Sequence, residues 1–140
     1  MTTPSALVFL IDDDASVRKG VSRLLRAAGY KCETFASATG FLAREPYGGP
    51  TCLIVDVRMP GLNGYQFVRA LRGDRETAET PIVILSALVQ DREQLAGMLT
   101  GADAYLIKPV KIVDLVDAID RAVHLSEEER TAYTRQLFGQ

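Results

Sequence analysis

The chain has 140 residues, of which 47% are hydrophobic, and its formal net charge is -2. This length is typical of a single domain, and the charge lacks the excess of Lys and Arg that would bind phosphates, so we expect no direct nucleic-acid binding by this chain. Its apolar runs are far shorter than the roughly 20 residues of a membrane span and MTTPS lacks the charged region of a signal peptide, which predicts a cytoplasmic protein with no membrane segment.

Strand-like and helix-like segments alternate along the chain, which predicts an α/β fold with a doubly wound parallel sheet covered on both faces. The predicted strands span residues 6–11, 31–35, 51–55, 81–85 and 104–107. Helical spacing of apolar residues between and after them predicts five helices, the first with Val17, Val21, Leu24, Leu25 and Ala28 on its apolar face and Gly29 as its stop. The second begins after Ser37 as N-cap, the third ends at Gly73, the fourth spans 90–100, and the fifth carries Ile112, Leu115, Val116, Ile119 and Val123.

We expect one domain over residues 1–124 and a helical tail or linker over 125–140. Ser126 and Glu129 have the spacing of a capping box, which favours a further helix in the tail. Cys32 and Cys52 lie in predicted strands without the spacing of a zinc or redox motif, so we interpret both as reduced core thiols. His124 ends the last core helix, where a surface position is typical.

Four predicted strands each end on a residue suited to phosphate or metal chemistry: Asp12 and Asp13, Asp56, Ser86, and Lys108. Because the carboxyl ends of parallel strands share one edge of the sheet, these side chains should form one site. Phosphoryl transfer needs a nucleophile, a divalent cation and groups that bind the phosphoryl oxygens, and this set offers all three.

Each of these residues also has an ordinary structural interpretation. An acidic run at a helix start often only caps the helix, which is how we interpret Asp14. Asp56 could be a turn residue, Ser86 could bond the backbone, and Lys108 could lie along the surface. Four strand ends with complementary chemistry in one α/β chain favour the functional interpretation.

The segments IDDDASVR, LIVDVRMPGLNGYQF, PIVILSA and GADAYLIKP resemble the motifs of the response-regulator receiver domains of two-component signalling, over residues 6 to about 124. The resemblance implies a flavodoxin-like sheet of order 2-1-3-4-5 and a cis Lys108–Pro109 bond. That order would put Cys32 and Cys52 on strands separated by the first strand, beyond disulfide reach.

The resemblance implies that Asp56 is the phosphoacceptor and that Mg²⁺, or Mn²⁺, is the cofactor. Asp13 and Asp56 would bind the cation directly, the backbone carbonyl of Arg58 would be a third ligand, and Asp12 would act through water. Lys108 would pair with the phosphoryl oxygens.

Signalling roles follow from the same resemblance. Ser86 and Tyr105 would be the switch residues, although a strand aromatic is more often core. Arg58 and Leu88 would tune the lifetime of the phosphoryl group. The change would be transmitted through the fourth helix, fifth strand and fifth helix, which could also form a homodimer.

The implied partner is a sensor histidine kinase, and an effector domain, of the helix-turn-helix DNA-binding kind, could follow the tail. In this interpretation the chain is a switch that assists only its own phosphorylation and dephosphorylation. One alternative is an interaction module that works without phosphorylation. The other is a phosphatase of the haloacid dehalogenase type, but such enzymes carry a second Asp where this chain has Arg58.

Overall fold

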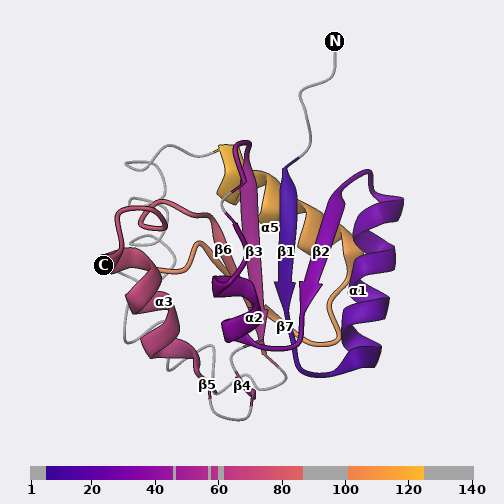
Figure 1. The fold of residues 1–140 in the computed structure, drawn as a ribbon. Coiled ribbons are helices and arrows are strands. Elements are labelled where there is room, and N and C mark those ends of the chain that lie inside the picture. The colour runs from indigo at the N-terminus through magenta and orange to yellow at the C-terminus, as the bar shows by residue number, and fades with distance from the viewer. Residues whose placement is uncertain (1–5, 46, 57, 60–61, 87–100, 125–140) are drawn as a thin grey trace, which may run out of the picture.

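The computed structural model describes residues 6–45, 47–56, 58–59, 62–86 and 101–124. Within these residues the five predicted strands and four of the predicted helices occur in the predicted chain order (Figure 1). The strands are β1 (Leu7–Ile11), β2 (Lys31–Phe35), β3 (Thr51–Asp56), β4 (Arg58–Met59), β5 (Leu62–Asn63), β6 (Ile82–Ser86) and β7 (Ala104–Ile107). The helices are α1 (Ala15–Ala27), α2 (Ala38–Leu42), α3 (Gly64–Gly73) and α5 (Ile112–His124). The predicted helix over 90–100 and the predicted tail lie outside the described residues.

Five strands form one parallel sheet in the order β2-β1-β3-β6-β7. Counted along the chain, β6 and β7 are the fourth and fifth strands that enter this sheet, because β4 and β5 are not part of it. The expected order 2-1-3-4-5 is therefore confirmed. The short strands β4 and β5 form a separate antiparallel pair in the segment that the sequence predicts as a loop. The β4–β5 pair follows the carboxyl end of β3, which is the edge of the sheet where the functional residues were predicted.

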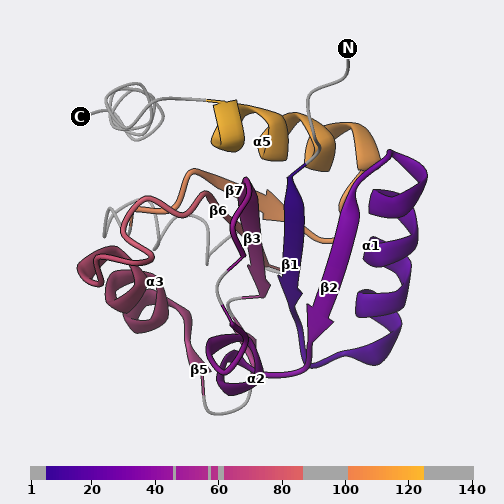
Figure 2. The same ribbon diagram turned by 45° about the horizontal axis from the view of Figure 1, so that its top comes forward.

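Helices cover both faces of the sheet, α1 and α5 on one and α2 and α3 on the other (Figure 2). Alternate residues of each strand enter opposite layers, as the two-residue period of a strand requires. Phe9 belongs to the core layer of Phe67 and Leu71 of α3, whereas its neighbour Leu10 belongs to the layer of Leu25 and Ile119. Strands buried on both faces explain the nearly continuous apolar runs in the sequence.

The two cysteines and the apolar face of α1 were both predicted from the sequence, and the structure bears out only the first in full. Val8 pairs with Cys32 on one side and with Cys52 on the other, so β1 separates the two cysteines, and both are buried free thiols. The expected apolar face of α1 is wrong for Leu24, which is 38% exposed, and for Ala28, which is also exposed, whereas Val21 and Leu25 are buried. Leu24 therefore lies on the flank of α1, and the apolar face is narrower than the sequence suggests.

A partly buried ion pair lies at the amino ends of β6 and β7, at the opposite end of these strands from the predicted site. Arg72 of α3 donates through Nη2 to the Asp103 carboxylate at 3.2 Å and through Nε to the Gly101 carbonyl at 2.9 Å. The same Asp103 oxygen accepts from the backbone N–H of Ile82 at 2.8 Å. Gly101 has a φ of +94°, and a Cβ there would lie 3.2 Å from Cγ of Arg72, so this position favours glycine.

Candidate functional site

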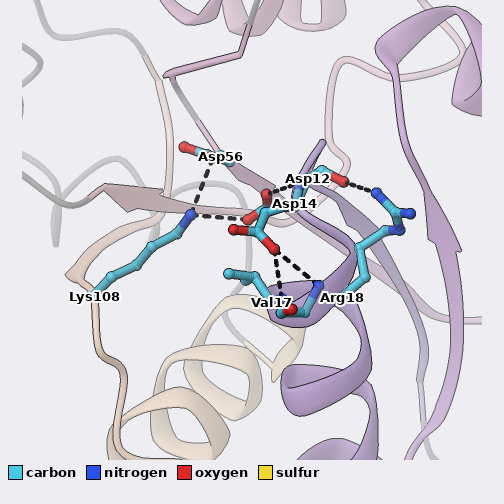
Figure 3. Close-up of polar contacts among 7 residues, drawn as sticks. Asp12, Asp14, Val17, Arg18, Asp56 and Lys108 are labelled. Atoms are coloured by element: carbon cyan, nitrogen blue, oxygen red, sulfur yellow. Dashed lines mark hydrogen bonds and ion pairs between the residues drawn. The ribbon is translucent and has the colours of Figure 1, made fainter.

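The predicted site residues converge at the carboxyl edge of the sheet. Asp12 directly follows β1, Asp56 ends β3, Ser86 ends β6, and Lys108 directly follows β7. Figure 3 shows Lys108 reaching toward Asp12 and Asp56 from the β7 side. The topology therefore brings together side chains that lie up to 96 positions apart in the sequence.

Asp12, Asp13 and Asp56 form an acidic cluster, with one carboxylate oxygen of each lying within 4.8 Å of the others. The Asp12 and Asp56 side chains are buried at the strand ends, whereas Asp13 is exposed. Three carboxylates supply only oxygen ligands, which are the ligands that Mg²⁺ prefers, and the exposed member leaves room for bound water. The donor set of this chain therefore fits a hydrated divalent cation.

Lys108 is the counter-charge of this cluster. Its Nζ donates to Oδ2 of Asp12 at 2.9 Å and to Oδ2 of Asp56 at 3.0 Å. Partial burial lowers the pKa of Lys108, but the hydrogen bonds and attraction to the two carboxylates outweigh it, so the pKa lies above its usual value of 10.5. The ammonium is consequently held in its charged form between the two buried acids.

The turn after β1 is fixed by several hydrogen bonds. Asp14 is the N-cap of α1, accepting from the backbone N–H of Ser16 and Val17, as predicted. Oδ1 of Asp12 accepts from the backbone N–H of Asp14 at 2.9 Å. Arg18 was not predicted as part of this turn, and its Nη1 donates to the Asp12 carbonyl at 2.7 Å. Helical side chains lean toward the helix N-terminus, which is the signal that could have pointed to it.

The remaining predicted residues take different positions. Ser86 is buried at the end of β6, and its carbonyl accepts from the Lys108 N–H at 2.7 Å. Tyr105 is partly buried against the layer that contains α3. Arg58 lies in β4, two residues after Asp56. Leu88 lies outside the described residues. The Lys108–Pro109 bond is cis, as the resemblance implied.

Other predicted features lie away from the cluster. His124 is exposed at the end of α5, with Nδ1 3.0 Å from the Asp120 carbonyl oxygen and 3.1 Å from the Asp120 carboxylate. Its surface position agrees with the prediction. Among the helices that the structure describes, none is both long and apolar enough to span a bilayer.

Comparison with known proteins agrees with this geometry. TdiR, a transcriptional regulatory protein of Thauera aromatica, is 34% identical over 127 residues, covering 91% of this chain and 55% of TdiR. MtrA, a DNA-binding response regulator of Mycobacterium tuberculosis, is 30% identical over 129 residues, covering 92% of this chain and 55% of MtrA. The chain thus spans about half the length of these two relatives.

A solved structure shares the fold. The chemotaxis response regulator CheY4 of Vibrio cholerae aligns with a TM-score of 0.71 at 31% identity, over 85% of this chain and 99% of CheY4. The family model of the response regulator receiver domain matches residues 8–120. These residues contain all five strands of the sheet and the acidic cluster with its lysine. The chain therefore belongs to the response regulator receiver domain family, the signalling domains of two-component systems.

Proposed function

We propose that this receiver domain is switched on when Asp56 accepts a phosphoryl group in a Mg²⁺-dependent reaction. The donor would be a phosphohistidine of a partner sensor histidine kinase or a small phosphodonor such as acetyl phosphate. The observation that carries the proposal is the placement of Asp56, a buried carboxylate beside two further carboxylates and 3.0 Å from the Lys108 ammonium. This arrangement unites a nucleophile, a cation site and a fixed positive charge.

The cation ligands would be the carboxylates of Asp13 and Asp56 and the backbone carbonyl of Arg58, with Asp12 acting through water. Mn²⁺ could take the place of Mg²⁺. When bound, the cation would neutralise charge on the carboxylates and on the phosphoryl oxygens. Asp13 suits direct ligation because it is exposed, whereas Asp12 already holds Lys108 and the turn N–H of Asp14.

In the transfer step, a carboxylate oxygen of Asp56 attacks phosphorus and forms a new O–P bond. The bond from phosphorus to the imidazole nitrogen, or to the acetate oxygen, breaks, and its electron pair leaves with that group. Lys108 keeps its proton throughout, since its ammonium is needed to balance charge on the phosphoryl oxygens. The product is an acyl phosphate, which adds nearly two negative charges to a buried position.

The switch would follow from this added charge. The Ser86 hydroxyl would bond a phosphoryl oxygen, and Tyr105 would move with it. The change would then reach β7, α5 and the predicted fourth helix, which lies outside the described residues. That face could pair with a second copy of the chain. Arg58 and Leu88 would tune the lifetime of the acyl phosphate.

The output of the switch would be control of transcription. TdiR and MtrA are described as transcriptional and DNA-binding regulators, and this chain covers 55% of each. By analogy, a DNA-binding effector domain would follow the predicted tail over residues 125–140. The net charge of -2 supports a role in which that domain, rather than the receiver, binds DNA. The kinase and its receiver would meet in the cytoplasm.

The test is phosphorylation by acetyl phosphate, with intact mass as the readout. Wild-type chain with Mg²⁺ should gain one phosphoryl group, in an adduct that is stable in acid and labile in base. Asp56→Asn should gain none, and chelation of the cation should abolish labelling of the wild type. Asp14→Asn is the matched control, because it removes a neighbouring charge but keeps a capping side chain.

Three results would contradict the proposal. Equal labelling of Asp56→Asn and wild type would exclude Asp56 as the acceptor. Sustained hydrolysis of a generic phosphate ester, over many turnovers per Asp56, would favour the phosphatase interpretation instead. Partner binding with the same affinity in the labelled and unlabelled protein would favour a module that works without phosphorylation.

A further inference from the structure

Arg18 connects α1 to the acidic cluster. It lies in the first half of α1 (Ala15–Ala27), half-buried, and its Nη1 donates to the Asp12 carbonyl at 2.7 Å. Figure 3 shows Arg18 and Lys108 approaching Asp12 from opposite sides. Lys108 binds the Asp12 carboxylate, whereas Arg18 binds the Asp12 backbone.

The carbonyl that Arg18 binds lies between two regular elements. Ile11 is the last residue of β1, and the first helical bond of α1 runs from the Arg18 N–H to the Asp14 carbonyl at 3.0 Å. Asp12 therefore precedes the helical hydrogen bonds and follows the strand. The Arg18 side chain therefore donates a hydrogen bond to the Asp12 carbonyl, which takes no part in the hydrogen bonds of the helix.

The orientation of this carbonyl bears directly on Asp13. The C=O of Asp12 and the N–H of Asp13 belong to one planar peptide unit, so a bond that fixes the carbonyl also fixes how the chain enters Asp13. The Asp12 N–H is held by the Phe35 carbonyl at 3.0 Å, and its Oδ1 by the Asp14 N–H. Arg18 is the one contact in this set that acts on the peptide leading to Asp13.

We propose that Arg18 is a positioning residue for the cation site. By holding the Asp12–Asp13 peptide, its guanidinium keeps the exposed Asp13 carboxylate beside Asp12 and Asp56. Asp13 has the least burial of the three acids, so its placement depends most on the backbone that carries it. The inference rests on the proposed function, because it takes this cluster to be the site of a divalent cation.

Electrostatics makes the opposite prediction, which gives the test its direction. A guanidinium beside a cation site repels the incoming cation, so removal of its charge alone should strengthen cation binding. Loss of the hydrogen bond that positions the Asp12–Asp13 peptide should instead weaken cation binding. The sign of the change in affinity therefore separates a role in geometry from a role as a nearby charge.

The experiment measures Mn²⁺ binding to the full chain by electron paramagnetic resonance, with Mg²⁺ as competitor. Loss of a hydrogen-bonding partner behind a metal ligand typically weakens affinity by about tenfold or more, and we expect this for Arg18→Met. Arg18→Lys keeps the charge but not the reach of the guanidinium, and should also bind Mn²⁺ more weakly than wild type. Arg23→Met removes an exposed Arg from the same helix and should not weaken binding.

The outcomes are distinct. Equal or tighter Mn²⁺ binding by Arg18→Met would overturn the proposal, as would wild-type affinity in Arg18→Lys. If Arg18→Met does not fold, as judged by its melting curve, Arg18→Lys decides alone. Absence of Mn²⁺ binding to the wild type would refute the cation site of the proposed function, whereas a wild-type site that is indifferent to Arg18 would refute only the present inference.

Discussion

Replacement of Lys108 by Met tests whether the ion pairs at the strand ends stabilise the fold. The change removes an ammonium that donates to Asp12 at 2.9 Å and to Asp56 at 3.0 Å, while a side chain of similar length remains. Hydrogen bonds to charged groups contribute about 1.5 to 3 kcal/mol each, and the variant no longer bears the cost of partly burying the ammonium. We expect a net loss of about 3 kcal/mol in the free energy of unfolding at pH 7, or about 10 °C in melting temperature.

The assay is urea unfolding followed by circular dichroism, with and without Mg²⁺. Because the variant has lost its own counter-charge at the acidic cluster, millimolar Mg²⁺ should stabilise it more than it stabilises the wild type. Lys111→Met, at an exposed lysine, is the control and should change stability by less than about 0.5 kcal/mol. A Lys108→Met variant as stable as this control would refute the reasoning.

The pH dependence of the same pair follows from the pKa of Lys108, which lies above 10.5 in the folded protein. A group whose folded pKa is raised contributes its full stability below the unfolded pKa, and that contribution is lost as pH rises through the folded pKa. The difference in stability between wild type and Lys108→Met should therefore be constant from pH 7 to about 10 and shrink above this range. If the difference in stability shrinks already near pH 8, the pKa of Lys108 is not raised and the prediction is wrong.

Two further predictions concern the opposite end of the sheet and the start of α1. Asp103→Ala removes the carboxylate that pairs with Arg72 and accepts from the Ile82 N–H. It should lower the free energy of unfolding in urea by about 3 kcal/mol, because it breaks a partly buried ion pair from one side. Asp103→Asn keeps an acceptor and should cost less. Equal losses would mean that the neutral acceptor kept by Asn contributes nothing, and that the whole loss comes from the missing charge. Asp14→Ala removes the N-cap of α1 and should cost about 1 kcal/mol, whereas Asp14→Asn should be nearly neutral by the same measurement.

The parts of the fold that follow from local pattern could be predicted from the sequence. Apolar runs that end on polar residues located the five main strands, and the parallel arrangement then placed Asp56 and Lys108 at one edge. Asp14 was correctly predicted as a cap, because capping depends on the next three residues alone. The order of the strands came from the resemblance rather than from periodicity, since alternation predicts a doubly wound sheet but not one order.

The features that were missed leave little or no pattern in the sequence. Strands β4 and β5 are two residues long, too short for any periodicity to appear. Arg72 binds the Gly101 carbonyl, 29 positions along the chain, and nothing in its own neighbourhood marks this contact. Arg18 binds the Asp12 carbonyl six positions earlier, and only the lean of helical side chains toward the helix N-terminus points to that contact. Leu24 was placed in the core because helical spacing gives the direction of a face but not its width.

The separation of 96 positions between Lys108 and Asp12 has a consequence for synthesis of the protein. During synthesis, Asp12 and Asp56 leave the ribosome long before β7 is made. The growing chain therefore contains these two acids before it contains Lys108. Contacts between such distant segments must overcome the entropy of closing the intervening loop, so they form slowly and cannot form before Lys108 has been made. The set of site residues is thus complete only when the last strand of the sheet, β7, has brought Lys108 beside the two acids. A new molecule should therefore become able to accept a phosphoryl group only late in its synthesis and folding.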